Sequence, residues 1–211
     1  MLARLRSSQD QEPTQVVRHK SGDPTDAQLA ERIQRGDQST RSAAFEELYK
    51  RHLNTVFGYA FRRLGNREAA EDATSEIFRD VVRSMSKYQS VKDKTFRSWL
   101  FTIAHHVVAD HAARLSRERM YLGTPDPLAS DPAPSPVEEA IAAEERSWIR
   151  AQLAILSPRE RQVIEFDLTG MKTAEIAIVL GLDSGAVHTA RCRALARLQA
   201  HLGTLDGTPE K

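Results

Sequence analysis

Apolar residues recur at helical spacing along most of the chain, and each run ends at a glycine or at a polar cluster. In the first half this pattern predicts helices from Asp26 to Gly36 and over residues 39–64, 67–85 and 95–119. In the second half it predicts helices that begin at Pro158, Thr173 and Ser184. The sequence has no alternating pattern typical of strands and no internal repeat. It therefore predicts an all-α fold.

Proline divides the chain into parts. Five of the nine prolines lie in GTPDPLASDPAPSP, residues 123–136, which is typical of a linker and not of a packed element. The sequence therefore predicts two small helical domains joined by a Pro-rich linker, with a flexible basic arm before them and a frayed tail after them. The expected boundaries are 1–25 for the arm, 26–120 for the first domain, 121–137 for the linker, 138–202 for the second domain and 203–211 for the tail.

The segment from Leu156 to Leu202 has the pattern of a helix-turn-helix. Ser157 lies directly before Pro158 and three residues before Glu160, which predicts a capped helix start. Gly181 supplies the turn before the last helix, which Asp183 or Ser184 caps. Two short helices joined by a glycine turn are typical of DNA-binding proteins. The positions expected to face inward are Val163, Ile164, Leu168, Ile176, Ala177, Leu180, Val187, Ala190, Ala194 and Leu198.

Charge supports this interpretation of the last helix. The whole chain has a net charge of +1, so a nucleic-acid surface requires local segregation of charge. The last helix has no Asp or Glu between Ser184 and Leu202, and its basic side chains are His188, Arg191, Arg193, Arg197 and His201. Cations without anions suit a phosphate backbone. The alternative is a solvated basic face on an ordinary helical bundle.

Three predicted helices of the first domain define its core and its candidate chemistry. The helix at 67–85 turns a charged face outward, which pattern alone would explain as solvation. The helix at 95–119 follows a lysine-rich loop and combines aromatic with basic residues, as a platform for single-stranded nucleic acid does. For Phe96 and Trp99 themselves, a role in the core is favoured. In the helix at 39–64 the residues expected inward are Phe45, Leu48, Tyr49, Leu53, Val56, Phe57 and Phe61.

Composition excludes several classes of protein. Cys192 is the single cysteine, so an internal disulfide and a cysteine-rich zinc site are excluded, which fits a reducing cytoplasm. The sequence has no apolar run of membrane-spanning length and no signal-peptide core near its start. No cofactor or metal is expected.

The two halves together resemble the sigma-70 family of RNA polymerase sigma factors, of the compact extracytoplasmic-function (ECF) type. The resemblance lies in AAEDATSEIFRDV and FRSWLFTIAHHVVADHAAR, and later in LSPRERQVIEF and AEIAIVLGLDSGAVHTARCRAL. It implies a sigma-2-like domain followed by a sigma-4-like domain. It also implies an initiation factor without bond chemistry of its own, which binds core RNA polymerase, recognises the −10 and −35 promoter elements and promotes promoter melting.

The resemblance assigns residues to three surfaces. Docking on the clamp helices of the polymerase β′ subunit falls to Asp72, Glu76, Arg79 and Asp80. Binding and melting of the −10 element fall to Lys92, Lys94, Arg97, Trp99, His105, His106 and Arg114. Binding of the −35 element falls to Ser184, His188, Thr189, Arg191, Cys192, Arg193 and Arg197, the last two as phosphate contacts. The polymerase β flap and an anti-sigma factor are further implied partners.

The chain departs from the family pattern at two places. His105 and His106 stand where members often have Arg and Asn, and imidazole lacks the permanent charge of arginine. In the last helix the family often reads Val-Lys-Ser-Arg-Leu, whereas this chain has Val187, His188, Thr189, Ala190 and Arg191. These departures bear on promoter preference and not on architecture.

Two other classes share part of the pattern. The LSPRE motif and the helix-turn-helix also resemble the output domain of LuxR-type regulators, which would place a sensory domain with strands before the linker. A metalloenzyme could use His105, His106, Asp110 and His111, but a third ligand with its supporting shell is not evident in the sequence.

Overall fold

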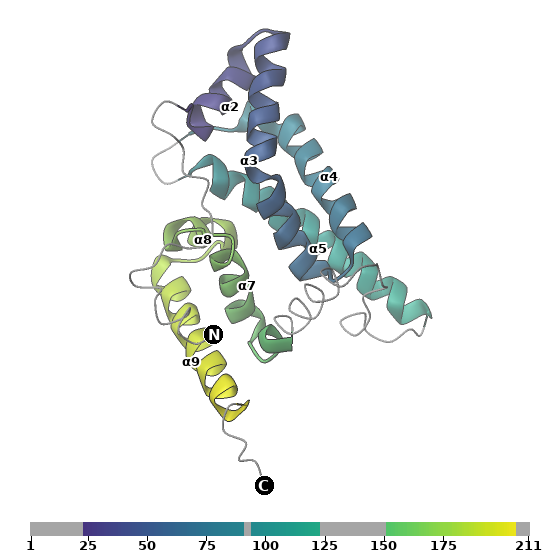
Figure 1. The fold of residues 1–211 in the computed structure, drawn as a ribbon, viewed down its shortest axis with the longest axis vertical. Helices are drawn as coiled ribbons and strands as arrows, with labels where there is room; N and C mark the ends of the chain where they lie inside the picture. The colour runs from purple at the N-terminus through teal and green to yellow at the C-terminus, as the bar shows by residue number, and fades with distance from the viewer. Residues whose placement is uncertain (1–22, 91–93, 123–150, 206–211) are drawn as a thin grey trace.

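The computed structural model describes residues 23–90, 94–122 and 151–205 (Figure 1). The first part contains α2 (Asp26–Arg35), α3 (Gln38–Leu64), α4 (Arg67–Ser84), the 3-10 turn η2 (Met85–Lys87) and α5 (Phe96–Leu122). The second contains α7 (Pro158–Asp167), α8 (Thr173–Leu180) and α9 (Ser184–Leu205). These ranges contain no strand, which confirms the all-α class. Most of the described residues in 23–90 and 94–122 are helical, where the LuxR-type alternative would place strands.

Local capping signals set where the first helices begin and end. Thr25 and Gln28 form a capping box at the start of α2, in which the Thr25 N–H donates to the Gln28 Oε1 at 2.8 Å. Gly65 ends α3 with a left-handed φ of 70°, a conformation that glycine adopts without steric cost. Asn66 then caps α4 by accepting a hydrogen bond from the Ala69 N–H at 2.9 Å.

The apolar faces of α2 to α5 pack into one core. Its buried residues include Leu29, Leu48, Val56, Ala60, Ile77, Val81, Leu100, Ala104 and Val108. One prediction for α3 is wrong, because Tyr49 is 37% exposed and lies at the edge of the stripe with its ring against Phe78. Tyr59 of the same helix is 1% exposed and was not expected in the core.

The helix-turn-helix forms as its capping residues predict. Ser157 and Glu160 make the expected capping box, with the Ser157 N–H donating to the Glu160 Oε2 at 2.9 Å. Gly181 takes a φ of 62° between α8 and α9. Of the two expected caps of α9, Asp183 is the one that accepts a hydrogen bond, from the Ala186 N–H at 2.8 Å.

Two side chains near the end of α7 differ from expectation. Leu168, predicted to face inward, is 55% exposed because the helix ends one residue earlier, at Asp167. Phe166 is fully buried. It stacks on Tyr59 of α3 with ring centroids 5.0 Å apart, and it meets Phe101 of α5 edge-on at 6.2 Å. The helix-turn-helix therefore packs directly against α3 and α5.

Helices α2 to α5 (the first unit) and α7 to α9 (the second unit) share a buried core, which includes Ile77 and Leu100 from the first unit and Ile176 and Val187 from the second. A separate, smaller cluster of Leu153, Leu156, Ile164 and Ala194 lies within the second unit. Figure 1 shows α7 and α8 beside α3 and α5. Most of the predicted linker lies outside the described residues.

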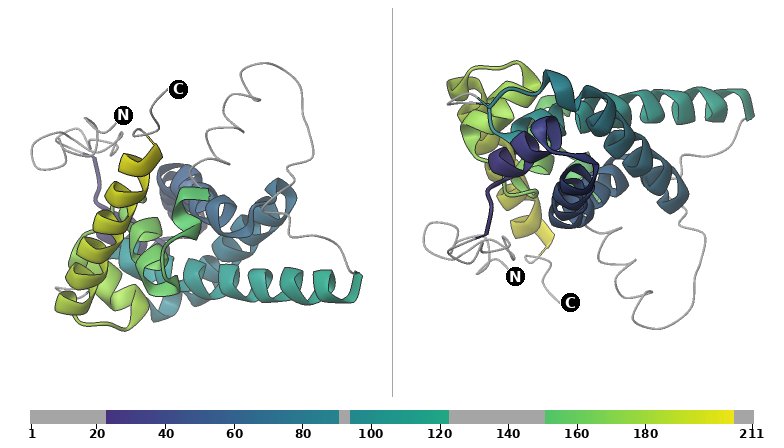
Figure 2. Two further views of the ribbon diagram at one scale, coloured as in Figure 1. Left: turned by 90° about the horizontal axis from the view of Figure 1, so that it is seen from below. Right: turned by 90° about the horizontal axis from the view of Figure 1, so that it is seen from above.

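Two helices run past the expected domain boundaries, which stay predictions. Helix α5 continues through Tyr121 and Leu122, which were assigned to the linker, and α9 continues to Leu205, past the expected end at Leu202. The last turns of α5 project beyond the rest of the structure (Figure 2). None of the helices in the described ranges combines the length and apolar character needed to span a bilayer.

Candidate nucleic-acid interface

One face of α9 lies in solvent and carries most of the residues predicted to bind the −35 element. The opposite face, with Val187, Ala190 and Ala194, is buried and anchors the helix. The exposed residues of the predicted set are Ser184, His188, Thr189, Cys192, Arg193 and Arg197. Successive turns thus present polar groups of different kinds, as a helix that reads base edges in the major groove requires.

Arg191 of α9 faces the protein. Its Nε donates to the Asp167 Oδ2 at 2.6 Å and its Nη2 to the Asp167 Oδ1 at 2.5 Å, while Nη1 donates to the Thr173 Oγ1 at 2.8 Å. Its side chain is 21% exposed. In this arrangement Arg191 joins α9 to the end of α7 and the start of α8, so its guanidinium is engaged within the helix-turn-helix.

The two arginines expected at phosphates differ in their surroundings. The Nη1 of Arg197 lies 3.2 Å from the Glu160 Oε2 in the capping box of α7. Arg193 is exposed and has no ion pair with the residues that the structure describes. Arg193 is therefore the more available of the two for a phosphate.

The predicted −10 residues of α5 are divided between solvent and the interior. Lys94, His106 and Arg114 are exposed, and Lys92 lies outside the described residues. Phe96 is buried, as its expected core role requires. Trp99 is half-buried, with its ring 5.1 Å from Tyr88 and 5.6 Å from Phe96.

Arg97 and His105, on the same helix, are covered by the helix-turn-helix. The Arg97 guanidinium donates to the backbone carbonyl of Thr169, and burial lowers its pKa. The His105 Nδ1 lies 3.2 Å from the Tyr59 hydroxyl, and its ring is 5.7 Å from Phe166. Burial is the largest cause of a lowered pKa for His105, so the neutral imidazole is favoured.

A charged cluster at this contact was not expected from the sequence. The Arg63 Nη1 of α3 lies 3.3 Å from the Glu165 Oε2 of α7, whose side chain is 3% exposed. Burial raises the pKa of Glu165, and burial lowers that of the neighbouring Arg62. A second polar link joins the residue before α5 to α8, because the Thr95 hydroxyl donates to the Glu175 Oε1 at 2.6 Å. Nothing in helical periodicity marks these residues, because their partners are remote in sequence.

Two of the four residues predicted to dock on the polymerase from α4 interact with other residues of this chain. Asp72 and Arg79 are exposed, as polymerase docking would require. The Glu76 Oε2 instead bonds the Nε2 of buried His111 at 2.8 Å, and this hydrogen bond is the largest cause of the lowered pKa of Glu76. Asp80 pairs with Arg83 of the same helix at 3.4 Å.

The four residues of the metalloenzyme alternative do not converge. His105 faces Tyr59, His111 faces Glu76, and His106 and Asp110 are exposed. No group of three or more ligating side chains suited to a metal occurs in ranges 23–90, 94–122 and 151–205. The geometry gives that alternative no support.

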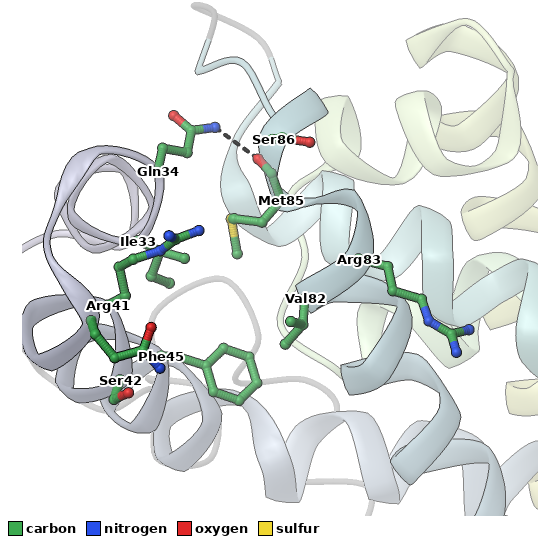
Figure 3. Close-up of a pocket in the computed structure, with 10 residues that line it drawn as sticks. Ile33, Gln34, Arg41, Ser42, Phe45, Val82, Arg83, Met85 and Ser86 are labelled. Carbon is green, nitrogen blue, oxygen red and sulfur yellow. Dashed lines mark hydrogen bonds between the residues drawn. The ribbon is translucent and has the colours of Figure 1, made fainter.

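A groove of about 720 Å³ lies between α2, α3 and the end of α4 (Figure 3). Ile33, Phe45, Val82 and Met85 provide its apolar lining, and Arg41 lines it as well. Its walls are held together by the Gln34 side-chain amide, which donates to the backbone carbonyls of Met85 and Tyr88. The groove is lined by neither α5 nor α9, so it is separate from the nucleic-acid surfaces.

Comparisons with known proteins find two sigma-factor family models in the chain. The family model Sigma-70 region 2 matches residues 48–118, and Sigma-70, region 4 matches residues 146–198. The ECF RNA polymerase sigma factor BldN of Streptomyces coelicolor is 30% identical over 92% of this chain and 74% of its own length.

Solved structures are similar as well. The structure of CnrH in complex with the cytosolic domain of CnrY has a TM-score of 0.64 at 25% identity, covering 85% of this chain and 97% of that one. The sigma factor RpoE from Bartonella quintana, solved with the anti-sigma factor NepR, has a TM-score of 0.60 at 19% identity. It covers 75% of this chain and 96% of the other, and at that identity it supports the fold alone.

Proposed function

The chain belongs to the sigma-70 family of RNA polymerase sigma factors, in its extracytoplasmic-function type, and from that membership we propose how its surfaces divide the work of transcription initiation. It is an initiation factor for core RNA polymerase. In the proposal, residues 26–120 bind the polymerase and the −10 element. Residues 138–202 bind the −35 element, and residues 121–137 connect the two.

The observation that carries the proposal is the exposed face of α9. It presents His188, Thr189, Cys192 and Arg193 to solvent, on a helix without an acidic residue from Ser184 to Leu202. His188, Thr189 and Cys192 would contact base edges, while Arg193 and Arg197 would hold phosphates and set the register. Arg191 would act from inside the domain, by fixing the position of α9.

The −10 element would be bound along α5. Lys94 and Arg114 would contact phosphates of the separated strand, and His106 would contact a base. Trp99 offers one half-buried ring, so its role would be to support the binding surface more than to stack freely on bases. Unstacking a base costs a few kcal/mol, and binding of the extruded base would offset that cost.

Polymerase docking would use the exposed side of α4. Asp72 and Arg79 supply charge there, and Val82, which follows Arg79 by three residues, adds an apolar side chain that is 54% exposed. Exposed apolar groups bordered by charges are typical of protein interfaces. Docking on the β′ clamp helices and, for the second unit, on the β flap would bring the DNA-binding surfaces to the promoter.

An anti-sigma factor is the further partner in this proposal. The chain would act in the cytoplasm, where its polymerase and promoters are, and would need no catalytic activity of its own. The polymerase supplies the bond chemistry, while this chain supplies recognition and strand capture.

Run-off transcription with core polymerase on a library of promoter fragments tests the proposal. We expect the full chain to direct initiation from fragments that share two upstream motifs, and to co-purify with core polymerase. A dimeric regulator outside the polymerase would bind DNA fragments without directing initiation by core enzyme. That result would contradict the proposed function.

A further inference from the structure

Three arginines line the surface of α3 and α5 that the helix-turn-helix covers. Arg62 and Arg63 lie in the last turn of α3, and Arg97 lies in the first turn of α5. Arg97 is eight residues before His105, or about 12 Å along the helix axis at 1.5 Å per residue. Arg63 is close enough to His105 to lower the pKa of that imidazole. The cations thus form a row long enough for about three stacked nucleotides at 3.4 Å each.

The covering helices place two carboxylates near this row, because Glu175 of α8 interacts electrostatically with Arg97, and Glu165 of α7 does so with Arg62 and Arg63. Glu165 is the only carboxylate that contacts Arg62 or Arg63 in the described ranges, and it reaches Arg63 with one oxygen at 3.3 Å. The Nε and Nη2 of Arg62, the Nε of Arg63 and the Nε of Arg97 are buried without a hydrogen-bond partner among the described residues. A buried N–H without a partner is costly, so this surface has more donors than the protein satisfies.

We propose that Arg62, Arg63 and Arg97 form a track for the backbone of the single DNA strand, and that α7 covers this track with Glu165 in the position of a phosphate. The proposal rests on the proposed function, because it extends the −10 surface from α5 onto α3. Arginine is the residue that matches phosphate oxygens with two donors, and the unsatisfied N–H groups supply such donors.

Closed packing and strand binding exclude each other in this arrangement. Phe166 stacks on Tyr59 and contacts His105, while the Thr169 carbonyl accepts from Arg97, so the strand cannot reach these groups until α7 moves away. The free chain is therefore held in a form with low affinity for single strands. If the two units bind at separate places on the polymerase, α7 would move away from α3 and α5 and leave the arginine track open to the strand.

The first experiment measures binding of a short fluorescent single-stranded DNA to the full chain without polymerase. Glu165→Gln removes the charge that competes with phosphate, and we expect it to raise the affinity roughly tenfold, the factor for about one charge-assisted hydrogen bond. Glu46→Gln is the matched control, because it makes the same charge change at an exposed ion pair with Lys50 on α3. Equal affinities for the two variants would overturn the proposal.

The second step adds Arg62→Gln or Arg63→Gln to the Glu165→Gln chain. Each should return the affinity toward the wild-type level and reduce the salt slope by about 0.7, the value for one phosphate contact on a single strand. Arg67→Gln, at an exposed arginine of α4, should change neither. A role of Arg62 and Arg63 in packing alone would leave the salt slope unchanged, which would also overturn the proposal.

Hydrogen exchange separates opening from unfolding. In the Glu165→Gln chain we expect faster exchange in the end of α7 and in α8, with α4 unchanged.

If exchange rises everywhere, the arginines are tested in the holoenzyme with otherwise wild-type sequence. There, Arg62→Gln and Arg63→Gln should reduce open-complex formation at least fivefold relative to Arg67→Gln, roughly the effect of one lost hydrogen bond to a charge. If the substitutions leave open-complex formation unchanged, the proposed track is wrong. If the wild-type holoenzyme itself fails to initiate transcription, the proposed function is contradicted.

Discussion

The guanidinium of Arg191 donates two hydrogen bonds to the carboxylate of Asp167, which joins the exposed helix α9 to the last residue of α7. The family pattern that this chain resembles implies an apolar residue at this position, whereas this chain has an arginine that forms an ion pair. Both side chains are partly exposed, at 21% and 31%, so solvent screening limits what the pair contributes. Its main effect is to fix the direction in which α9 presents its outer face.

The first prediction separates positioning by Arg191 from base reading. Arg191→Ala and Asp167→Ala should each weaken binding to −35 duplex DNA by a similar factor, and the double variant should lose little more. A double-mutant cycle on unfolding should give a coupling of roughly 1 kcal/mol. If Arg191→Ala alone changes which base is preferred at one position, Arg191 reads DNA directly and the positioning role is wrong.

The second prediction concerns the exposed residues of α9. Arg193→Gln should weaken all −35 sequences alike and reduce the salt slope by about one, because one phosphate contact is lost. His188→Ala should instead cost about 1–3 kcal/mol for the preferred sequence and relax preference at a single base pair. Titration of duplexes at several salt concentrations distinguishes the two, with exposed Gln199→Ala as the control.

The third prediction tests the exposed side of α4. Val82→Glu should reduce affinity for core polymerase by about 2 kcal/mol, because it places a charge in the apolar part of the interface. Lys50→Glu makes an exposed change on α3 and should leave that affinity unaltered. Pull-down titrations with both chains measure the difference. If core polymerase retains both variants equally, Val82 is not part of the docking surface.

The fourth prediction is a loss of stability on acidification through His105. Burial is the largest cause that lowers its pKa below the ordinary 6.5, and Arg63 and His106 add repulsion. Above pH 6.5 the imidazole is neutral in the folded and the unfolded chain. As the pH falls below 6.5, the unfolded chain takes up a proton that the folded chain refuses, so the free energy of unfolding decreases.

Thermal melting between about pH 7.5 and about pH 5.5 measures this effect in the wild type and in His105→Gln. The variant should lose less stability over that range. Glu165 acts in the opposite direction, because burial raises its pKa and its contribution to stability is lost as the pH rises above 4.5. The difference between the two chains isolates His105, and parallel melting profiles would contradict its assignment.

Local signals in the sequence were enough to predict most of the fold. Ser157 with Glu160 and the glycine at 181 act within a few residues of themselves, so their structural effect follows from the sequence pattern. Glu165 and Phe166 depend on a contact between α7 and α3, which joins positions about a hundred residues apart. A carboxylate between Ile164 and Phe166 has no periodic signal that distinguishes burial from exposure.

The same reason explains the mixed outcome on α5. Its apolar stripe faces the bundle, and the core role predicted for Phe96 in that stripe is confirmed, since Phe96 is 3% exposed. Arg97 and His105 lie off that stripe and were therefore expected in solvent, but the second unit covers them. Single-sequence periodicity describes how one helix faces its own bundle, and a second domain adds an interface that the pattern does not encode. The assigned roles of the DNA-facing residues stay predictions.

The last prediction uses two glycines with different backbones. Gly181 has a φ of 62° in the turn of the helix-turn-helix, and a Cβ there would meet no atom within 4 Å. Gly181→Ala should therefore cost about 1 kcal/mol from backbone strain alone. Gly203 lies in α9, and a Cβ there would also meet nothing within 4 Å. Gly203→Ala should stabilise the chain by up to about 1 kcal/mol, because alanine favours the helix. Denaturant unfolding of the two variants measures both signs, and a stabilised Gly181→Ala chain would mean that the turn does not hold its left-handed conformation in solution.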